Sequence, residues 1–225
     1  DTLEKPTRLS RELGDVHPMG NPHVWLDPLN AASIAERIAE TLVRLDPEHA
    51  DTYRQRSDDF ARRLDVALFG AALVEQVGRK KLRREARHGR LDRFLSQHEL
   101  SDQLDGWSSR ARAVAEHPIV TYHRTWSYFA ARFGITVAET IEEKAGIPPS
   151  ARHRDHVIEV VQREGVRVIL QAAFQDRSYA EAISEVTHVR VASVPADIGS
   201  EVGVSDYFAL IDRVFAALES ERSRP

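Results

Sequence analysis

The chain has 225 residues, of which 42% are hydrophobic, and a formal net charge of −4. This length and composition suffice for a buried core in one or two lobes, and the mild acidity gives no electrostatic reason to expect a nucleic acid or an anionic membrane as partner. The absence of cysteine excludes disulfides and thiolate ligands, and no apolar run reaches the roughly 18 residues that a membrane span needs.

The first motif lies near the start of the chain, after a polar, charged lead with no signal-peptide pattern. Residues 23–26 (His-Val-Trp-Leu) predict a short strand, and Asp27 followed by Pro28 predicts a helix start with an N-cap and a proline in the first turn. Asp46-Pro47 repeats this start and predicts a second helix. The first helix carries apolar residues at three-to-four spacing: Ile34, Ala35, Ile38, Ala39, Leu42 and Leu45.

Residues 70–112 have a helical pattern with a basic run at 79–84. One interpretation of the run is a patch that binds anions or nucleic acid. The other is a solvated helix face, which we favour because four acidic residues interleave nearby: Glu75, Glu85, Asp92 and Glu99. We therefore expect a helical segment with a solvated face.

From Pro118 onward, strand and helix patterns alternate with short loops, which predicts an α/β fold with a parallel sheet flanked by helices. Ligands of such sheets bind beyond the carboxyl ends of the strands, and His123 follows the first strand directly. The predicted strands are 119–122, 135–138, 166–170 and 189–194. The predicted helices are 125–133 ending at Gly134, one from Ser150 to Gly165, one capped by Ser178, and a terminal helix through Leu218.

Four motifs, in this order, resemble the metal-binding receptor proteins of zinc and manganese ABC importers. They are Asn-Pro-His-Val-Trp-Leu-Asp-Pro at 21–28, Tyr-His to Tyr-Phe at 122–129, Gly-Ile-Pro-Pro-Ser at 146–150, and Gly-Val-Ser-Asp-Tyr-Phe at 203–208. The similarity extends from about Gly14 to about Leu218. Any one motif would be a weak signal, but four in the same order are specific.

The resemblance implies a two-lobed receptor with a long interlobe helix, whose N-terminal lobe is largely absent from this chain. We expect 1–28 to be a remnant of that lobe with the first metal motif, 29–117 the helical backbone with its insertion, 118–203 the C-terminal α/β lobe, and 204–225 the terminal helix. A fragment or processed form of a longer receptor is favoured over a short, self-contained relative.

The candidate ligands are His23, His123 and Asp197. Imidazole suits zinc and its transition-metal neighbours, although a lone histidine on a strand is more often structural. Aligned on Gly199, the usual carboxylate of the family falls on Ala196, so Asp197 is one residue late. The alternative for Asp197 is a loop aspartate with a turn hydrogen bond. Glu201 is a weaker stand-in.

Three further histidines have less support. His17 could be an accessory ligand on a loop, but an exposed loop histidine is the favoured interpretation. His153 and His156 have the i, i+3 spacing of a surface zinc chelate, yet charged neighbours favour a solvated helix face.

The resemblance implies a substrate-binding component of an ABC transporter, not an enzyme. It would bind Zn²⁺, with Mn²⁺ as the alternative, as transported ligand, and deliver it to an ABC permease in the membrane. We expect a periplasmic or extracellular monomer, associated with the membrane through its permease, with no nucleic-acid partner. The rival predictions are a zinc-dependent hydrolase, in which Glu142 or Glu143 would serve as base only by accident of the fold, and a scaffold lobe that no longer binds metal. A nucleotide-binding enzyme ranks low because the glycine-rich loops are absent.

Overall fold

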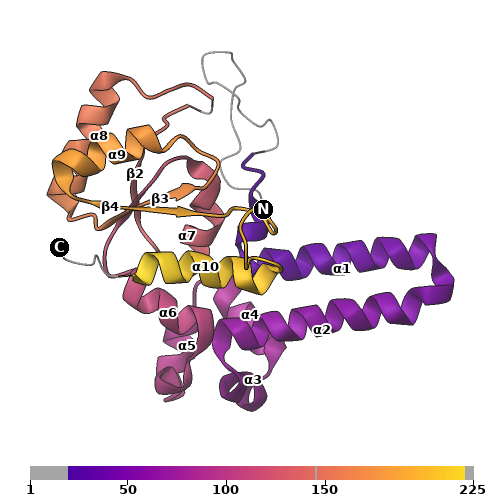
Figure 1. Ribbon diagram of the computed structural model, residues 1–225. Helices are drawn as coiled ribbons and strands as arrows, with labels where there is room; N and C mark the ends of the chain where they lie inside the picture. Colours follow the sequence, from indigo (N-terminus) through magenta and orange to yellow (C-terminus); the bar gives the residue numbers. More distant parts are fainter. Residues whose placement is uncertain (1–19, 145, 221–225) are drawn as a thin grey trace. The chain divides into compact units, whose positions relative to one another are not determined.

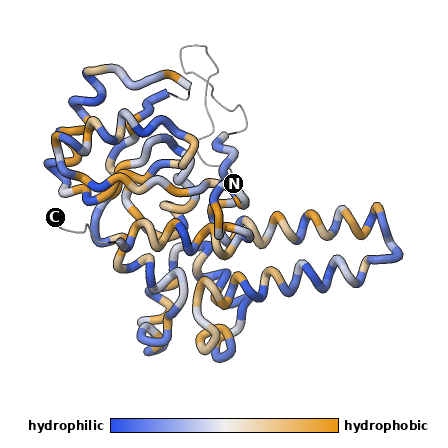
Figure 2. Tube along the Cα trace, in the orientation of Figure 1, coloured by the Kyte–Doolittle hydropathy of each residue, from blue (hydrophilic) through white to orange (hydrophobic). Residues whose placement is uncertain are grey.

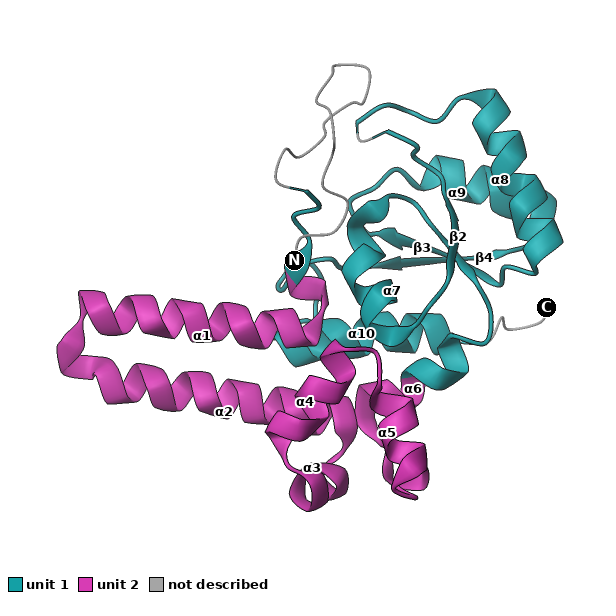
Figure 3. Ribbon diagram, turned by 180° about the vertical axis from the view of Figure 1, so that it is seen from behind, with its two compact units in different colours: residues 1–24, 111–225 teal, residues 25–110 magenta. Residues whose placement is uncertain are grey.

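A computed structural model describes residues 20–144 and 146–220. The chain divides into two compact units, residues 1–24 with 111–225 (unit 1) and residues 25–110 (unit 2) (Figure 3). Within the described residues, no helix combines the length and apolar character that crossing a membrane requires.

Unit 1 is built on a four-stranded parallel sheet in the order β2-β1-β3-β4 (Figure 1). The strands are β1 (Ile119–Thr121), β2 (Val137–Thr140), β3 (Val168–Ala172) and β4 (Arg190–Val194). The predicted parallel sheet is thus confirmed, although β2 and β3 each begin two residues later than expected. The register shifts by one residue between Ile119 and Val120, so that Ile119 pairs with Val137 but Thr121 pairs with Thr140.

Four helices cover the two faces of the sheet, so that β3 is buried along its whole length. α8 (Ala151–Glu164) and α9 (Arg177–Thr187) cover one face, whereas α7 (Ser127–Phe133) and α10 (Tyr207–Glu219) lie on the other (Figure 1). On the first face the core comprises Val120, Tyr122, Ile141, Val157, Val161, Val166, Ile169, Ala180, Ile183 and Val189. On the second, Phe129, Phe133 and Phe215 pack with ring centroids 4.8–5.2 Å apart.

Most predicted helix ends are confirmed by their caps. The Ser150 side chain accepts from the backbone N–H of His153, and Gly134 and Gly165 end their helices in the left-handed conformation. Ser178 is not the cap of α9. Asp176 takes that position and accepts from the Ser178 N–H, since its carboxylate competes better for the exposed donors of the first turn.

Unit 2 is helical throughout its described residues. α1 (Pro28–Leu45) and α2 (Ala50–Phe69) form a hairpin through the 3₁₀ turn η3 (Pro47–His49). α1 begins as predicted, with the Asp27 carboxylate accepting from the Leu29 N–H at 2.8 Å. α1 carries apolar stretches along its length while α2 is mostly hydrophilic (Figure 2). The remaining elements are α3 (Ala71–Val77), α4 (Arg79–Arg87), α5 (Leu91–Gln97), η4 (Ser101–Gln103) and α6 (Gly106–Val114), which crosses into unit 1.

The predicted strand at 23–26 is wrong, because these residues form the 3₁₀ turn η2 (Val24–Leu26). The Val24 N–H donates to the Pro22 carbonyl at 2.7 Å, which closes a tight turn where a strand would extend. Local turn chemistry at Asn21 and Pro22 outweighs the β propensity of the residues that follow.

The helical insertion begins after α2, and its last residues lie beside the C-terminal end of that helix. The Asp105 N–H donates to the Phe69 carbonyl at 3.2 Å. Gly106 has a φ of +67°, and a Cβ there would lie 2.2 Å from the Ala67 carbonyl oxygen, so only glycine fits this return.

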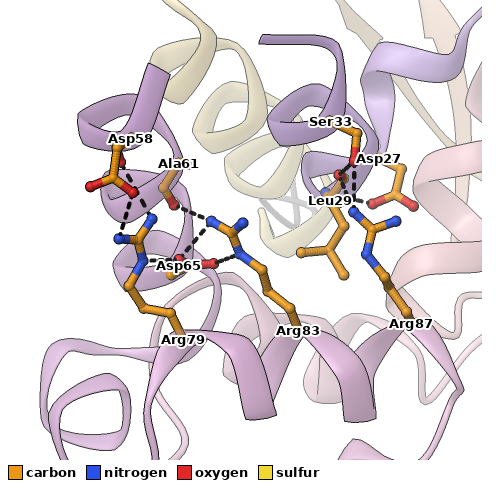
Figure 4. A network of polar contacts seen from close by, with 9 residues as sticks. All are labelled: Asp27, Leu29, Ser33, Asp58, Ala61, Asp65, Arg79, Arg83 and Arg87. Carbon is orange, nitrogen blue, oxygen red and sulfur yellow. Dashed lines mark hydrogen bonds and ion pairs between the residues drawn. The ribbon is translucent and has the colours of Figure 1, made fainter. Parts of the chain in front are cut away.

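Two arginines of the basic run, Arg79 and Arg83, bind a buried carboxylate. The prediction that the run forms a solvated helix face is therefore wrong for these two residues. Both guanidinium groups bind Asp65 of α2, whose side chain is fully buried, at 2.5–2.7 Å (Figure 4). Arg79 also contacts Asp58, and Arg83 donates to the Ala61 carbonyl. Burying a carboxylate is costly unless cations and donors surround it, which is what α4 supplies.

Candidate metal centre

The first candidate ligand, His23, is held by the side chain of Asn21, which is 6% exposed. The Asn21 Oδ1 accepts from the His23 backbone N–H at 3.0 Å and lies 2.8 Å from the His23 Nδ1. These contacts within one short turn fix the imidazole ring relative to its own backbone.

The same asparagine joins the two histidine motifs. Its Nδ2 donates to the Arg124 carbonyl at 2.7 Å, and its backbone carbonyl accepts from the Tyr128 hydroxyl at 3.1 Å. Arg124 directly follows His123, so Asn21 holds two segments about a hundred residues apart in contact beside the two candidate histidines. Both segments belong to unit 1.

Asn21 also determines the tautomer of His23. The Arg124 carbonyl can only accept and the His23 backbone N–H can only donate, so the amide nitrogen and oxygen of Asn21 cannot be exchanged. Its Oδ1 therefore faces Nδ1, which must carry the proton. The lone pair of the neutral ring then lies on Nε2, as metal ligation requires.

The second candidate, His123, lies two residues beyond the end of β1. Its side chain is 20% exposed, and its Nδ1 lies 2.7 Å from the Glu142 Oε2. His123 stands at the N-terminus of the 3₁₀ turn η5 (Arg124–Trp126), next to the buried Thr125 and Trp126.

The third candidate, Asp197, is exposed and lies three residues after β4. Its backbone carbonyl accepts from the Ser200 hydroxyl at 2.7 Å. Ala196, where the family carboxylate would align, is buried. Glu201 is bound instead to Arg213 of α10 at 3.0 Å.

Among residues 20–144 and 146–220, no group of three or more histidine, aspartate or glutamate side chains is close enough to hold one metal ion. The structure thus brings the His23 and His123 motifs together, whereas the trio with Asp197 stays a prediction. His17 lies outside the described residues.

Contrary to the prediction of a solvated helix face, His153 is buried. Its side chain is 8% exposed, and its Nε2 donates to the Thr140 carbonyl at 2.7 Å. His156 is 48% exposed and contacts Glu139 at 3.3 Å. The two rings are thus bound to β2, with centroids 6.0 Å apart.

A pocket of about 540 Å³ lies in unit 2, along α1 and α2, and contains none of the predicted ligands. Its lining mixes acidic residues such as Glu36 and Glu40 with arginines, including Arg79 and Arg83 that are bound to Asp65. Its chemistry is unlike that of an imidazole-based metal site.

Sequence reasoning missed the roles of Asn21 and Glu142. For Asn21 a signal was present, because an asparagine two residues before a backbone N–H commonly accepts from it. For Glu142 the signal depends on strand register: Thr121 pairs with Thr140, and the same offset pairs His123 with Glu142.

The chain is similar to known proteins over most of its length. The family model described as "Zinc-uptake complex component A periplasmic" (ZnuA) matches residues 3–68 and 93–221. The zinc-uptake protein ZnuA of Brucella abortus is 22% identical over 180 residues, which are 80% of this chain and 43% of the relative. The iron-binding protein YfeA of Yersinia pestis is 25% identical over 205 residues, 88% of this chain and 54% of the relative.

Among solved structures, a Zn(II)-bound variant of AdcAII from Streptococcus pneumoniae has a TM-score of 0.61 at 22% identity, covering 97% of this chain and 66% of that one. This likeness establishes the fold. The chain spans about half the length of the curated relatives that it matches.

Proposed function

This chain belongs to the family of periplasmic zinc-uptake components, and from that premise we propose that it is the substrate-binding part of an ABC importer that captures Zn²⁺. His23 and His123 act as ligands in this proposal, and Asp197 is the candidate carboxylate. The chemistry is ligand exchange, in which the metal is bound and handed on unchanged.

The observation that carries the proposal is the Asn21 junction. One buried side chain binds the His23 imidazole and the backbone next to His123, while its own backbone carbonyl accepts from Tyr128. A purely structural histidine needs no such linkage to a second histidine segment. A pair of ligands does, because a metal ion tolerates only small errors in ligand position.

Zinc is favoured over manganese because the two best-supported ligands are imidazoles, whereas manganese sites lean toward carboxylates. Iron, zinc and manganese all occur in the names of relatives and neighbours, so Mn²⁺ is the metal to test beside zinc.

The partner in this proposal is an ABC permease, and the location is the periplasm or outer cell surface, where the chain acts as a monomer. The family description places its members in the periplasm. The proposed four-part division, with 1–28 from an N-terminal lobe and 118–203 as the C-terminal lobe, belongs to the same scheme.

Thermal unfolding of the metal-stripped chain, with and without Zn²⁺ or Mn²⁺, tests the proposal. Zinc at a hundred times its dissociation constant should add about 2.7 kcal/mol to the free energy of unfolding, because it binds only the folded state. His23→Ala and His123→Ala should each abolish the rise in midpoint.

His156→Ala is the matched control, since this histidine belongs to the same unit and is 48% exposed. It should keep the full zinc effect. Loss of the effect in His156→Ala alone would assign zinc to the surface pair with His153, and no rise in the wild-type chain would contradict zinc capture.

A further inference from the structure

Glu142 is brought to His123 by the pairing of two parallel strands. Beyond the ends of β1 and β2 the ladder continues, with the Ile141 N–H donating to the Thr121 carbonyl at 2.9 Å and the Glu142 N–H to the Tyr122 carbonyl at 2.8 Å. The one-residue shift at Ile119 sets this register. Without it, Ile141 would take the place opposite His123, and the carboxylate would point to the other face.

Both carboxylate oxygens of Glu142 are engaged. Oε2 lies 2.7 Å from the His123 Nδ1, and Oε1 accepts from the Gly146 N–H at 3.0 Å. The Glu142 side chain is 15% exposed, so it is largely shielded from water. The backbone pairing and the Gly146 bond hold this carboxylate from two sides.

We propose that Glu142 is the positioning residue of the metal centre, holding the His123 imidazole with its proton on Nδ1 so that Nε2 faces the metal. The two atoms lie 2.7 Å apart, which is ion-pair distance, although their alignment does not make a hydrogen bond in the structure. Since a carboxylate carries no proton, a proton on the His123 Nδ1 is the arrangement that avoids two facing lone pairs. This role rests on the proposed function, since His123 is the ligand being oriented.

The two imidazoles then differ as ligands. His23 is backed by the neutral amide of Asn21, and His123 by the anionic carboxylate of Glu142. A carboxylate behind a ligating histidine raises its basicity as well as fixing its orientation, so His123 is the stronger donor. Asn21 and Glu142 perform the same geometric task with different electrostatic strength.

Glu142→Gln tests the role because it preserves size and removes one acceptor. A glutamine offers one oxygen and one NH₂ group to two donors, the Gly146 N–H and the His123 Nδ1–H. If its oxygen stays with Gly146, its NH₂ group faces Nδ1 and selects the opposite tautomer, with the proton on Nε2 where the metal must bind. We expect zinc affinity to fall about 10- to 100-fold.

Two readouts on the full chain separate positioning from stability. The ¹⁵N chemical shifts of the His123 ring in the metal-free protein report its tautomer, and competition with a chromophoric chelator reports zinc affinity. The wild type should carry the His123 proton on Nδ1, and Glu142→Gln should change that signal while weakening zinc. Glu143→Gln, the neighbouring carboxylate that is 57% exposed and faces His153, should change neither.

A wild-type His123 with its proton on Nε2 would overturn the proposal, whether or not the variant folds. So would a Glu142→Gln protein with unchanged tautomer and zinc affinity. Since the tautomer is recorded without metal, it tests the Glu142 contact independently of zinc binding. A wild-type chain that binds no zinc would count against the proposed function, whatever the tautomer.

Discussion

Asn21 shows how one side chain can determine both the chemistry and the position of a ligand. It uses its amide oxygen for His23, its amide nitrogen for Arg124 and its backbone carbonyl for Tyr128. No other residue type of similar size offers an acceptor and a donor at these two places. Aspartate is the most informative replacement, since it retains the acceptor and loses the donor.

Asn21→Asp should therefore weaken zinc binding by about tenfold, the lower end of the effect of losing a group that supports a ligand. The His23 contacts survive, but a carboxylate oxygen now faces the Arg124 carbonyl and pushes the two histidine segments apart. Chelator competition measures the change. Asn30→Ala, on α1, is the control, and equal affinity of Asn21→Asp and wild type would show that the junction does not serve the metal.

Tyr122 gives a pH-dependent prediction. Burial, with contributions from the carboxylates of Glu142 and Asp176, raises the pKa of Tyr122 to about 12 from an ordinary value of 10.0. Between these values the unfolded chain has lost a proton that the folded chain retains. The contribution of Tyr122 to the free energy of unfolding is thus complete below pH 10 and is lost as the pH rises through 12.

Urea unfolding from about pH 9 to about pH 12 measures this slope. Tyr122→Phe should make the decline shallower across the window, because phenylalanine has no proton to lose. Equal slopes in the two proteins would mean that the phenol ionises alike in the folded and unfolded chain.

At the scale of the elements, α4 is fastened to α2 by a buried ion cluster. Asp65 is fully buried, whereas its partners Arg79 and Arg83 are 28% and 25% exposed. Asp65→Asn leaves two guanidinium groups without their shared countercharge. Because these cations keep some water, we expect a loss of about 3 kcal/mol in the free energy of unfolding, the low end for a broken buried pair.

The control is Asp58→Asn, which removes an aspartate that is 72% exposed and binds only Arg79 of this cluster. It should cost about 1 kcal/mol or less. Chemical denaturation of both variants measures the difference, and similar small losses in the two would mean that Asp65 is not the anchor of α4.

Elements whose signals are local were the ones predicted from sequence. Asp27 and Ser150 cap their helices because a short polar side chain needs only the N–H groups of the next turn. The basic run was misinterpreted because its partner, Asp65, lies 14 to 18 residues away on another helix, and no local pattern reveals such a pair. The strand predicted at 23–26 failed where turn chemistry competed with β propensity.

At the scale of the whole molecule, the fold class followed from the alternation of strands and helices, and the four motifs led to the family. The junction of His23 with the His123 segment could not follow from residues alone, because it joins positions 103 residues apart through a backbone carbonyl. The contact of Glu142 with His123 depends on a single register shift in β1, which leaves no trace in the amino-acid pattern.

The ion cluster also links a stretch that the family model matches to one that it leaves unmatched. Arg79 and Arg83 lie within residues 69–92, which the family model leaves unmatched, whereas Asp65 lies in the matched part. A homologue without this segment would bury a carboxylate with no cation beside it, which selection removes. The segment and the aspartate should therefore occur together. Homologues that lack residues 69–92 should carry an uncharged residue at the position of Asp65, and an alignment of the family would test this expectation.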